Sequence, residues 1–167
     1  MNDDLTLRDC TPADAAIIAE LYNESIIAGN ATMDDEPKTA EEIRAQIEKF
    51  DARETILLLE KQGEVLGWGI IKKYSDRHGY RFACETSVYL RHKHVRKGYG
   101  SSIKNALIER CKQYRYHHLV AKIFADNTAS IEYNKKFGYE IVGRQKEIGF
   151  KNGRWQDVVI MQLVLSE

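Results

Sequence analysis

A basic segment with two closely spaced glycines, residues 91–102, is the part of the chain best suited to bind an anion. It reads Arg-His-Lys-His-Val-Arg-Lys-Gly-Tyr-Gly-Ser-Ser and contains no acidic residue. Gly98 and Gly100 let the backbone approach a ligand closely. A helix that starts here directs its free N–H groups and the positive end of its dipole to the same point. The segment therefore predicts a pyrophosphate site, and a solvated basic turn is the alternative.

Two common phosphate-binding motifs do not fit the spacing of these glycines. The Walker motif has four residues between its glycines and continues Gly-Lys-Ser/Thr, whereas a single residue separates Gly98 from Gly100. The dinucleotide-binding motif requires a third glycine near position 103, where this chain has Ile103. Both motifs are therefore excluded.

Hydrophobic periodicity predicts the elements that position this segment. Apolar residues three and four apart predict helices over residues 11–28, 39–50, 98–114 and 127–137. Alternating or continuous apolar runs predict strands over residues 5–8, 56–60, 65–71, 82–90 and 118–124, and then a C-terminal hairpin that turns at Asn152-Gly153. This order predicts a single α/β (α+β) domain over residues 1–167, with helices packed on a mixed sheet.

Composition excludes several functional classes. The 25 basic and 25 acidic residues give a formal net charge of zero, which disfavours nucleic-acid or membrane partners. Cys10, Cys84 and Cys111 are widely spaced and are expected to be reduced thiols. The pairs His92/His94 and His117/His118 lack a third ligand at supporting spacing, so no metal is expected. The absence of a signal peptide or apolar span predicts a cytoplasmic protein.

Two segments carry a resemblance to a known superfamily. Residues 95–100, Val-Arg-Lys-Gly-Tyr-Gly, resemble the signature Gln/Arg-x-x-Gly-x-Gly/Ala of the GNAT N-acetyltransferases, with Val95 in place of Gln/Arg. Residues 127–139 resemble the second acetyl-CoA segment of that superfamily. Further matches resemble the phosphinothricin and methionine sulfoximine acetyltransferases, in residues 21–23, 31–37, 77–80, 85–90 and 149–157. The resemblance implies a GNAT-like acyl-CoA N-acyltransferase fold, with a twisted, mostly antiparallel central sheet flanked by about four helices.

The resemblance also implies acetyl-CoA as co-substrate and a set of residues that bind it. Backbone groups of Val88 and Leu90 would pair with the pantetheine arm, and Arg91 and Lys93 could reach the 3′-phosphate. The amides from Arg96 to Ser101 would hold the pyrophosphate. The expected cofactor-binding residues are Val88, Tyr89, Leu90, Arg96, Lys97, Gly98, Tyr99, Gly100, Ser101, Asn127, Ser130, Asn134 and Lys136.

Acetyl transfer to an amine requires a base, because an α-amino group with a pKa of about 8 is mostly protonated at neutral pH. The resemblance places this base at Glu85, which would act directly or through a water. Its strand neighbours, residues 82–84 and 86–88, are uncharged, so we expect partial burial to raise the pKa of Glu85. An outward-facing strand carboxylate is the alternative. The amide of Val88 or Leu90 is the candidate donor to the developing oxyanion.

The proton for the departing CoA thiolate has a less obvious source. Many relatives carry Tyr or His at the position of Asn134, and asparagine cannot serve as a general acid. Tyr133 is the candidate, although it lies about 100° around the helix from that position. The alternatives are that Tyr133 only packs in the core, or that the thiolate leaves unprotonated, which a thiol pKa of about 8.5 permits.

The resemblance implies an acceptor that is a small amino acid or analogue, such as phosphinothricin, methionine sulfoximine or methionine sulfone. Arg77 would bind its acid group, and Met33, Tyr80 and Lys151 would form cleft walls. The alternatives are an acyl-CoA-binding regulatory module without turnover, or acetylation of a polyamine, an aminoglycoside or a protein N-terminus. Dimers are usual among the resembling proteins, so we expect a homodimer to which the C-terminal hairpin contributes.

Overall fold

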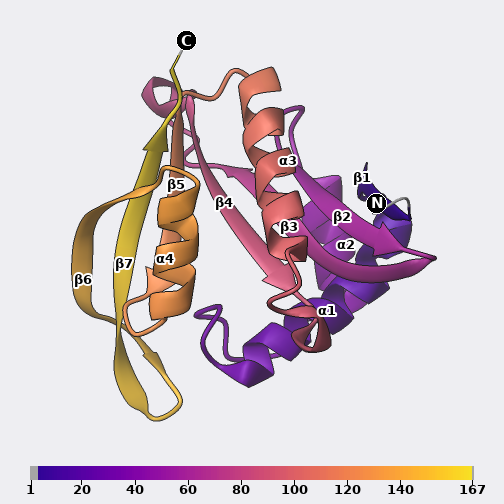
Figure 1. The fold of residues 1–167 in the computed structure, drawn as a ribbon, viewed down its shortest axis with the longest axis horizontal. Helices are drawn as coiled ribbons and strands as arrows, with labels where there is room; N and C mark the ends of the chain where they lie inside the picture. The colour runs from indigo at the N-terminus through magenta and orange to yellow at the C-terminus, as the bar shows by residue number, and fades with distance from the viewer. Residues whose placement is uncertain (1–3, 167) are drawn as a thin grey trace.

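The computed structural model describes residues 4–166 and consists of strands and helices in the predicted order. The strands are β1 (Leu5–Asp9), β2 (Thr55–Lys61), β3 (Glu64–Lys73), β4 (Ala83–Leu90), β5 (His118–Phe124), β6 (Glu140–Lys151) and β7 (Arg154–Val164). The α-helices are α1 (Ala15–Ala28), α2 (Ala40–Glu48), α3 (Tyr99–Gln113) and α4 (Thr128–Lys136). The seven strands form one sheet in the order β1-β2-β3-β4-β5-β7-β6 (Figure 1). Every neighbouring pair is antiparallel except β4 and β5, which are parallel, so the predicted mixed sheet is confirmed.

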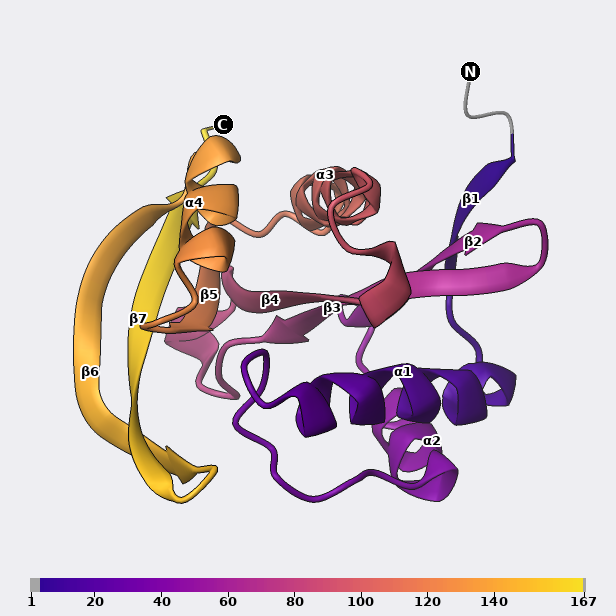
Figure 2. The ribbon, with the colours of Figure 1, turned by 60° about the horizontal axis from the view of Figure 1, so that its bottom comes forward.

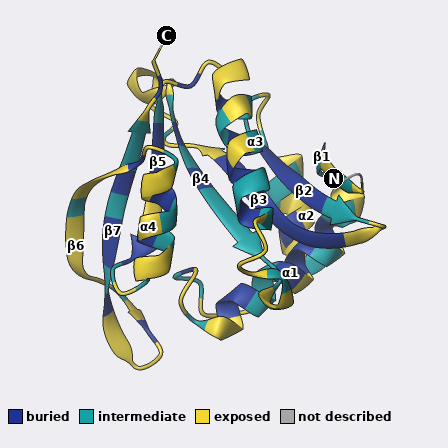
Figure 3. Ribbon diagram, in the orientation of Figure 1, coloured by how far each residue is buried: buried dark blue, intermediate teal, exposed yellow. Residues whose placement is uncertain are grey.

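Helices cover both faces of the sheet. Figure 2 shows α1 and α2 on one face and α3 on the other, and Ile131 of α4 belongs to the same buried cluster as Leu107 of α3. In β2, Ile56 contributes to the core under α1 and α2, whereas Leu57 contributes to the core under α3 and α4. A strand buried on both faces reads as a continuous apolar run. Figure 3 shows the contrast with the outer strand β6, which is mostly exposed.

Helix α3 packs closely on β3 because β3 carries glycines under it. A Cβ atom built on Gly69 would lie 2.6 Å from Ile103 Cγ2 and 2.7 Å from Leu107 Cδ1. A Cβ on Gly67 would lie 2.7 Å from the carbonyl oxygen of Tyr89. A side chain at position 69 would push α3 away from the sheet, and one at position 67 would collide with β4. This contact fixes the start of α3, and with it the predicted anion site, against the middle of the sheet.

Strands β4 and β5 separate along their length. They pair only at Ala83–His118, Cys84–Leu119 and Glu85–Val120. Beyond Glu85, β4 continues with β3, while β5 continues with β7 (Figure 1). The sheet therefore opens into a V whose vertex lies at Glu85.

Short 3-10 turns are the main departure from the predicted elements. The helix expected over residues 11–28 begins with one such turn (Pro12–Asp14), which is closed by a hydrogen bond of 2.8 Å from the Thr11 amide to the Asp14 carboxylate. Others lie at His78–Tyr80 and His92–His94 and are too short to show periodicity. The predicted C-terminal turn is confirmed, since both Asn152 (φ 55°) and Gly153 (φ 73°) have positive φ. Among the described residues, no helix has the length and apolar character needed to cross a membrane.

Replacing Gly69 tests the packing of α3 on β3. Gly69→Ala should lower the free energy of unfolding by about 1–3 kcal/mol, because the methyl group must displace Ile103 or Leu107. Gly143→Ala in β6 is the matched control, since no atom lies within 4 Å of its Cβ position, and it should change stability by less than about 0.5 kcal/mol. Urea titration of both variants measures the difference, and equal effects would contradict the close contact.

Candidate active site

A cleft with a volume of about 1290 Å³ opens where β4 and β5 part. Its walls come from β4, β5, α4, the start of α3 and the loop between α1 and α2. The residues expected from the sequence that line it are Met33, Glu85, Val88, Tyr89, Leu90, Arg96, Gly98, Gly100, Ser101, Asn127, Ser130, Tyr133 and Asn134. The structure therefore brings most of the expected site residues together.

The backbone of β4 offers unpaired groups to this cleft. The amide of Arg91 donates to the carbonyl of Leu66 near the start of β3, and the carbonyl of Ala83 accepts from the amide of Tyr74 just after β3. The odd-numbered residues of β4 therefore form their backbone hydrogen bonds with β3. Hydrogen-bonding directions alternate along an antiparallel strand, and Val88 and Leu90 therefore direct their N–H and C=O groups into the V. These two residues are the ones expected to pair with pantetheine. Tyr89 differs, because its backbone faces β3.

The side chain of Tyr89 also has a packing role that the sequence did not show. Its ring contacts Trp68, with centroids 4.6 Å apart, and Tyr22, with centroids 5.2 Å apart. This aromatic group belongs to the core under α1 and α2. Tyr89 therefore shapes the wall of the cleft on that face.

The start of α3 supplies free amide groups at the open end of the cleft. The first intrahelical bond runs from the amide of Ser102 to the carbonyl of Gly98, at 3.3 Å, which leaves the amides of Tyr99, Gly100 and Ser101 without an intrahelical acceptor. Gly98 has a φ of 82°, a left-handed conformation that glycine adopts without strain. This geometry fits a pyrophosphate group held by main-chain donors.

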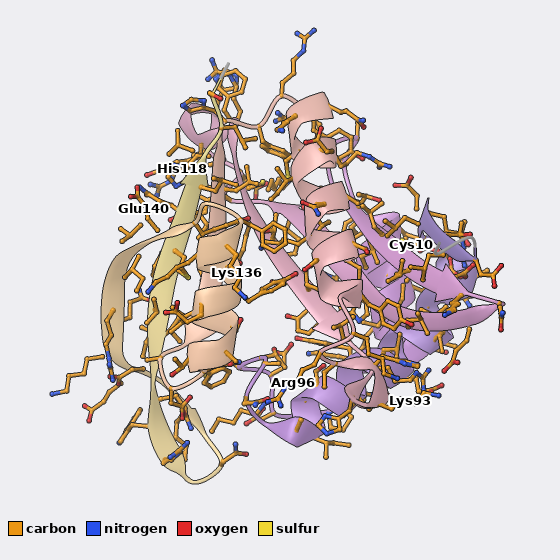
Figure 4. The ribbon with its side chains drawn as sticks, in the orientation of Figure 1. Cys10, Lys93, Arg96, His118, Lys136 and Glu140 are labelled. Carbon is orange, nitrogen blue, oxygen red and sulfur yellow. The ribbon has the colours of Figure 1, made fainter. Side chains whose placement is uncertain are left out.

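Ion pairs divide the cations of the basic segment into two groups. Arg91 lies 3.0 Å from Glu20, and Lys93 lies 2.6 Å from Glu64. These contacts hold both side chains that were expected to reach a 3′-phosphate. Arg96 and Lys97 form no ion pair with residues 4–166, and Figure 4 shows Arg96 and Lys93 on the segment before α3. Arg96 lines the cleft and Lys97 lies outside it.

Glu85 lies at the vertex of the V, and its side chain is 29% exposed. One of its carboxylate oxygens is 3.2 Å from the ammonium of Lys122 on β5. Cys84 contacts Cys111 of α3, and Thr86 contacts Tyr139, which lies between α4 and β6. Alternation therefore places Glu85 on the face covered by α1 and α2. Lys72, the register partner of Glu85 on β3, also lines the cleft there.

The loop between α1 and α2 is tied to the hairpin by a buried lysine. Lys151 is 3% exposed, and its ammonium donates to the carbonyls of Thr32 (2.7 Å) and Asp34 (2.5 Å). The Tyr22 hydroxyl joins the same loop through the Thr32 hydroxyl (2.8 Å). Lys151 was expected to be a cleft wall, but it does not line the cleft. Its role is to hold the loop that carries Met33.

The polar side chains that α4 presents to the cleft already form hydrogen bonds within the protein. The Asn127 side chain caps the helix by accepting from the Ser130 amide at 3.2 Å. The Asn134 amide group donates to the Ser130 carbonyl, and its buried Oδ1 has no partner in residues 4–166. The Tyr133 hydroxyl donates to the Gly100 carbonyl at 2.5 Å, which joins α4 to α3 across the cleft.

Four further expected residues lie outside the cleft of this chain. Arg77 and Tyr80 are exposed on the loop between β3 and β4, where Tyr80 packs on Tyr74. Tyr99 packs against the α3 core, and Lys136 is exposed at the end of α4. None of the four lines the cleft. The loop carrying Arg77 starts at the end of the sheet away from the V, because β3 and β4 run antiparallel past its vertex.

Four lysines that the sequence analysis did not identify line the cleft: Lys38, Lys72, Lys104 and Lys122. The strand predicted over residues 118–124 begins with a histidine and is otherwise apolar except for Lys122. Lys104 lies among the apolar positions Ile103 and Leu107 of the α3 stripe. For Lys122 and Lys104, the feature of the sequence that could have indicated a functional role is a basic residue inside an otherwise apolar strand or helix face.

Comparison with known proteins identifies the family. The family described as acetyltransferase (GNAT) domain matches residues 7–160. The chain belongs to the GNAT acetyltransferase family. The fold and the superfamily inferred from residues 95–100 and 127–139 are thereby confirmed.

Relatives of this GNAT acetyltransferase match along nearly its whole length. An L-methionine sulfoximine/L-methionine sulfone acetyltransferase of Pseudomonas paraeruginosa is 34% identical, over 96% of this chain and 95% of that protein. A phosphinothricin N-acetyltransferase of Alcaligenes faecalis is 33% identical, over 96% of this chain and 83% of that protein. The structure of a GNAT superfamily phosphinothricin acetyltransferase from Sinorhizobium meliloti in complex with acetyl-CoA is 31% identical. It aligns with a TM-score of 0.91 and covers 98% of this chain and 89% of that chain.

Within residues 4–166, no group of three or more His, Cys, Asp or Glu residues is arranged to hold a metal ion. The cleft instead combines a β4 backbone edge, a helix start and a carboxylate. These are groups that fit a pantetheine arm, a pyrophosphate and an amine.

Replacing Lys151 tests its role as an anchor of the α1–α2 loop. Lys151→Met removes two hydrogen bonds and leaves the carbonyls of Thr32 and Asp34 without their donor. The free energy of unfolding should fall by about 1–3 kcal/mol, and amide hydrogen exchange over residues 31–37 should accelerate. Lys146→Met, on the exposed side of the same strand, is the control and should leave both unchanged. Unaltered exchange in Lys151→Met would refute the anchoring role.

Proposed function

We propose that this chain is an N-acetyltransferase that transfers the acetyl group of acetyl-CoA to the amino group of a small amino acid or analogue. The observation that carries the proposal is the meeting of three features in one cleft. The free backbone edge at Val88 and Leu90 leads from the amides at the start of α3 to the carboxylate of Glu85. A long ligand with a diphosphate at one end and a reactive group at the other matches this arrangement.

Each part of the site has a distinct task in this proposal. Acetyl-CoA supplies an activated acetyl thioester. The amides of Tyr99, Gly100 and Ser101 hold the pyrophosphate, with Arg96 as the nearby cation. Glu85 accepts the proton of the acceptor ammonium, directly or through a water, so that a neutral amine can attack. The amide of Val88 or Leu90 donates to the negative charge that develops on the carbonyl oxygen, a contact of several kcal/mol.

The ion pair at the vertex favours a zwitterionic acceptor. Glu85 would receive the ammonium of an amino acid, and the two cations next to Glu85 in the cleft are Lys122, its ion-pair partner, and Lys72, its register partner on β3. We therefore assign the carboxylate of the acceptor to these lysines rather than to Arg77, which lies outside the cleft. Polyamines and aminoglycosides are poorer candidates, because a second cationic group would face Lys122.

The relatives named above support this substrate class. Methionine sulfoximine, methionine sulfone and phosphinothricin, which appear in their names, are all amino acid analogues with an amino and a carboxyl group. Two departures from the superfamily pattern favour a regulatory acyl-CoA-binding module without turnover: Val95 replaces Gln/Arg, and Asn134 cannot donate a proton. Activity measurements separate these two functions.

The proposal extends to the organisation of the protein. Residues 1–167 form one catalytic domain, which acts in the cytoplasm as a homodimer. The β6–β7 hairpin supports the dimer, because it carries large apolar side chains that are 49–62% exposed: Ile141, Val142, Ile148, Phe150 and Trp155. Exposed apolar area of this kind is typical of an interaction surface.

Replacing Glu85 tests its role as the base. Glu85→Gln should bind acetyl-CoA as the wild type does, because the amide keeps the shape of the side chain and lies apart from the pyrophosphate amides. Its kcat should fall about 100- to 10,000-fold, because the proton acceptor is lost. Thiol release with phosphinothricin, methionine sulfoximine and methionine sulfone measures turnover, and calorimetry measures binding.

The test of Glu85 has a control variant on the surface of α4. Glu132→Gln, an exposed residue of α4 that pairs with Lys135, should keep full activity. Equal turnover in wild type and Glu85→Gln would refute the assignment of the base. Acetyl-CoA binding without turnover by the wild type on any of these amines would favour the regulatory module.

A further inference from the structure

A lysine is buried in the cleft on the face of the sheet opposite to Glu85. Lys104 of α3 is 2% exposed and lines the cleft. Its ammonium lies 4.2 Å from the centre of the Tyr139 ring, and no carboxylate of residues 4–166 forms an ion pair with it. Burying an ammonium without a counter-ion costs several kcal/mol. A cleft residue of this kind is a candidate for a role in the reaction.

Lys104 lies at the closed end of the V. It is close enough to Cys84 of β4 and Cys111 of α3 to be affected by their thiols, which are 3.7 Å apart. Cys84 directly precedes Glu85, where β4 and β5 last pair. Side chains alternate along β4, so Cys84 faces Lys104 and Glu85 faces the acceptor side. A thioester held where the strands part would have the carboxylate on one side and the ammonium on the other.

The two residues of α4 that could protonate the departing thiolate are poorly suited to do so. Asn134 has no acidic proton at neutral pH. The Tyr133 hydroxyl already donates its hydrogen to the Gly100 carbonyl, and burial raises its pKa well above the ordinary value. This leaves Lys104 as the acid that lines the α3 face of the cleft.

We propose that Lys104 is the general acid that protonates the CoA thiolate as it leaves, an inference that rests on the proposed acetyl transfer. The carbon–sulfur bond breaks, the sulfur keeps the electron pair, and one proton moves from Lys104 Nζ to the sulfur. The products of this step are the CoA thiol and a neutral lysine. The acceptor nitrogen loses two protons in all, one as the ammonium becomes a neutral amine and one as the amide forms, and Glu85 passes both to solvent. Lys104 regains one proton from solvent, so each turnover releases one proton overall.

The surroundings of Lys104 match its acidity to this task. Burial lowers the pKa of Lys104 to about 8, close to the value of about 8.5 for a free thiol. Proton transfer between groups of similar pKa has almost no thermodynamic barrier. The titratable groups beside Lys104 are Cys84, Cys111 and Tyr139. Contact with the Cys111 thiol and burial raise the pKa of Cys84, and burial raises the pKa of Tyr139 and of Tyr133 on α4, so Cys84, Tyr133 and Tyr139 are neutral at pH 7.

The first test measures the ionisation of bound CoA, independently of turnover. Ultraviolet absorbance of the thiolate, followed against pH in the CoA complex, gives the thiol pKa. We expect that pKa to be higher in Lys104→Met than in wild type by about one unit, a tenfold change, because the ammonium no longer stabilises the thiolate. Lys112→Met, an exposed lysine of the same helix that pairs with Glu109, is the control and should match wild type.

The second test separates proton donation from charge. Lys104→Met should lower kcat about 100-fold without raising the KM of the acceptor. Lys104→Arg keeps the charge but holds its proton with a pKa above about 12, so the thiol pKa should stay low while kcat stays reduced. An unchanged thiol pKa in Lys104→Met, full kcat in Lys104→Arg, or a stable acetyl group on Lys104 found by mass spectrometry would each overturn the proposal.

A third measurement distinguishes catalysis from packing. Removing an unpaired buried charge should raise the melting temperature of the ligand-free protein in Lys104→Met, whereas loss of melting stability or failure to fold would mean that Lys104 is structural and would overturn the proposal. Failure of the proposed function gives a different result, since wild type would then release no CoA thiol with any amine tested.

Discussion

The separation of β4 from β5 beyond Glu85 is the constraint on which the site depends. Val88 and Leu90 direct hydrogen-bonding groups toward a partner strand that is absent there. Backbone groups left unpaired in a partly buried cleft are costly, and a pantetheine arm with its own amides can replace the missing strand. The fold therefore keeps one strand position open for a ligand. The other parts of the site, from the start of α3 to the loop tied by Lys151, are placed around that position.

Alternation along β4 divides the chemistry between the two faces of the sheet. Odd positions such as Glu85 face α1 and α2, where the acceptor enters in the proposed reaction. Even positions such as Cys84 and Thr86 face α3, where Lys104 lies. A strand in the middle of a sheet can thus present a base to one side of a reacting group and an acid to the other without any change in the backbone. The arrangement requires only that the strands part at the reacting group.

Local patterns predicted the elements, because periodicity and turn chemistry are local properties. The glycine-containing segment, the helix after it and the Asn152-Gly153 turn all lie where the sequence indicated. Side-chain roles that depend on non-local packing were predicted less well. Lys151 lies on a hairpin with an exposed outer strand, and only the contact with a loop more than 100 residues away shows that it is buried. Arg77 was placed by resemblance, and the course of its loop keeps it outside this cleft.

Lys104 has no carboxylate partner within residues 4–166, and the lack of a counter-ion favours its proposed role as a general acid. A carboxylate in contact would stabilise the ammonium and raise its pKa, so the proton would be held too tightly to reach a thiolate. Lys104 is instead packed against the Tyr139 ring and lies near Cys84 and Cys111, and desolvation lowers the pKa of its ammonium. The same burial that makes Lys104 unfavourable for stability therefore makes it a better acid. A structural lysine would be expected to have a counter-ion, and an acid that must release its proton is better without one.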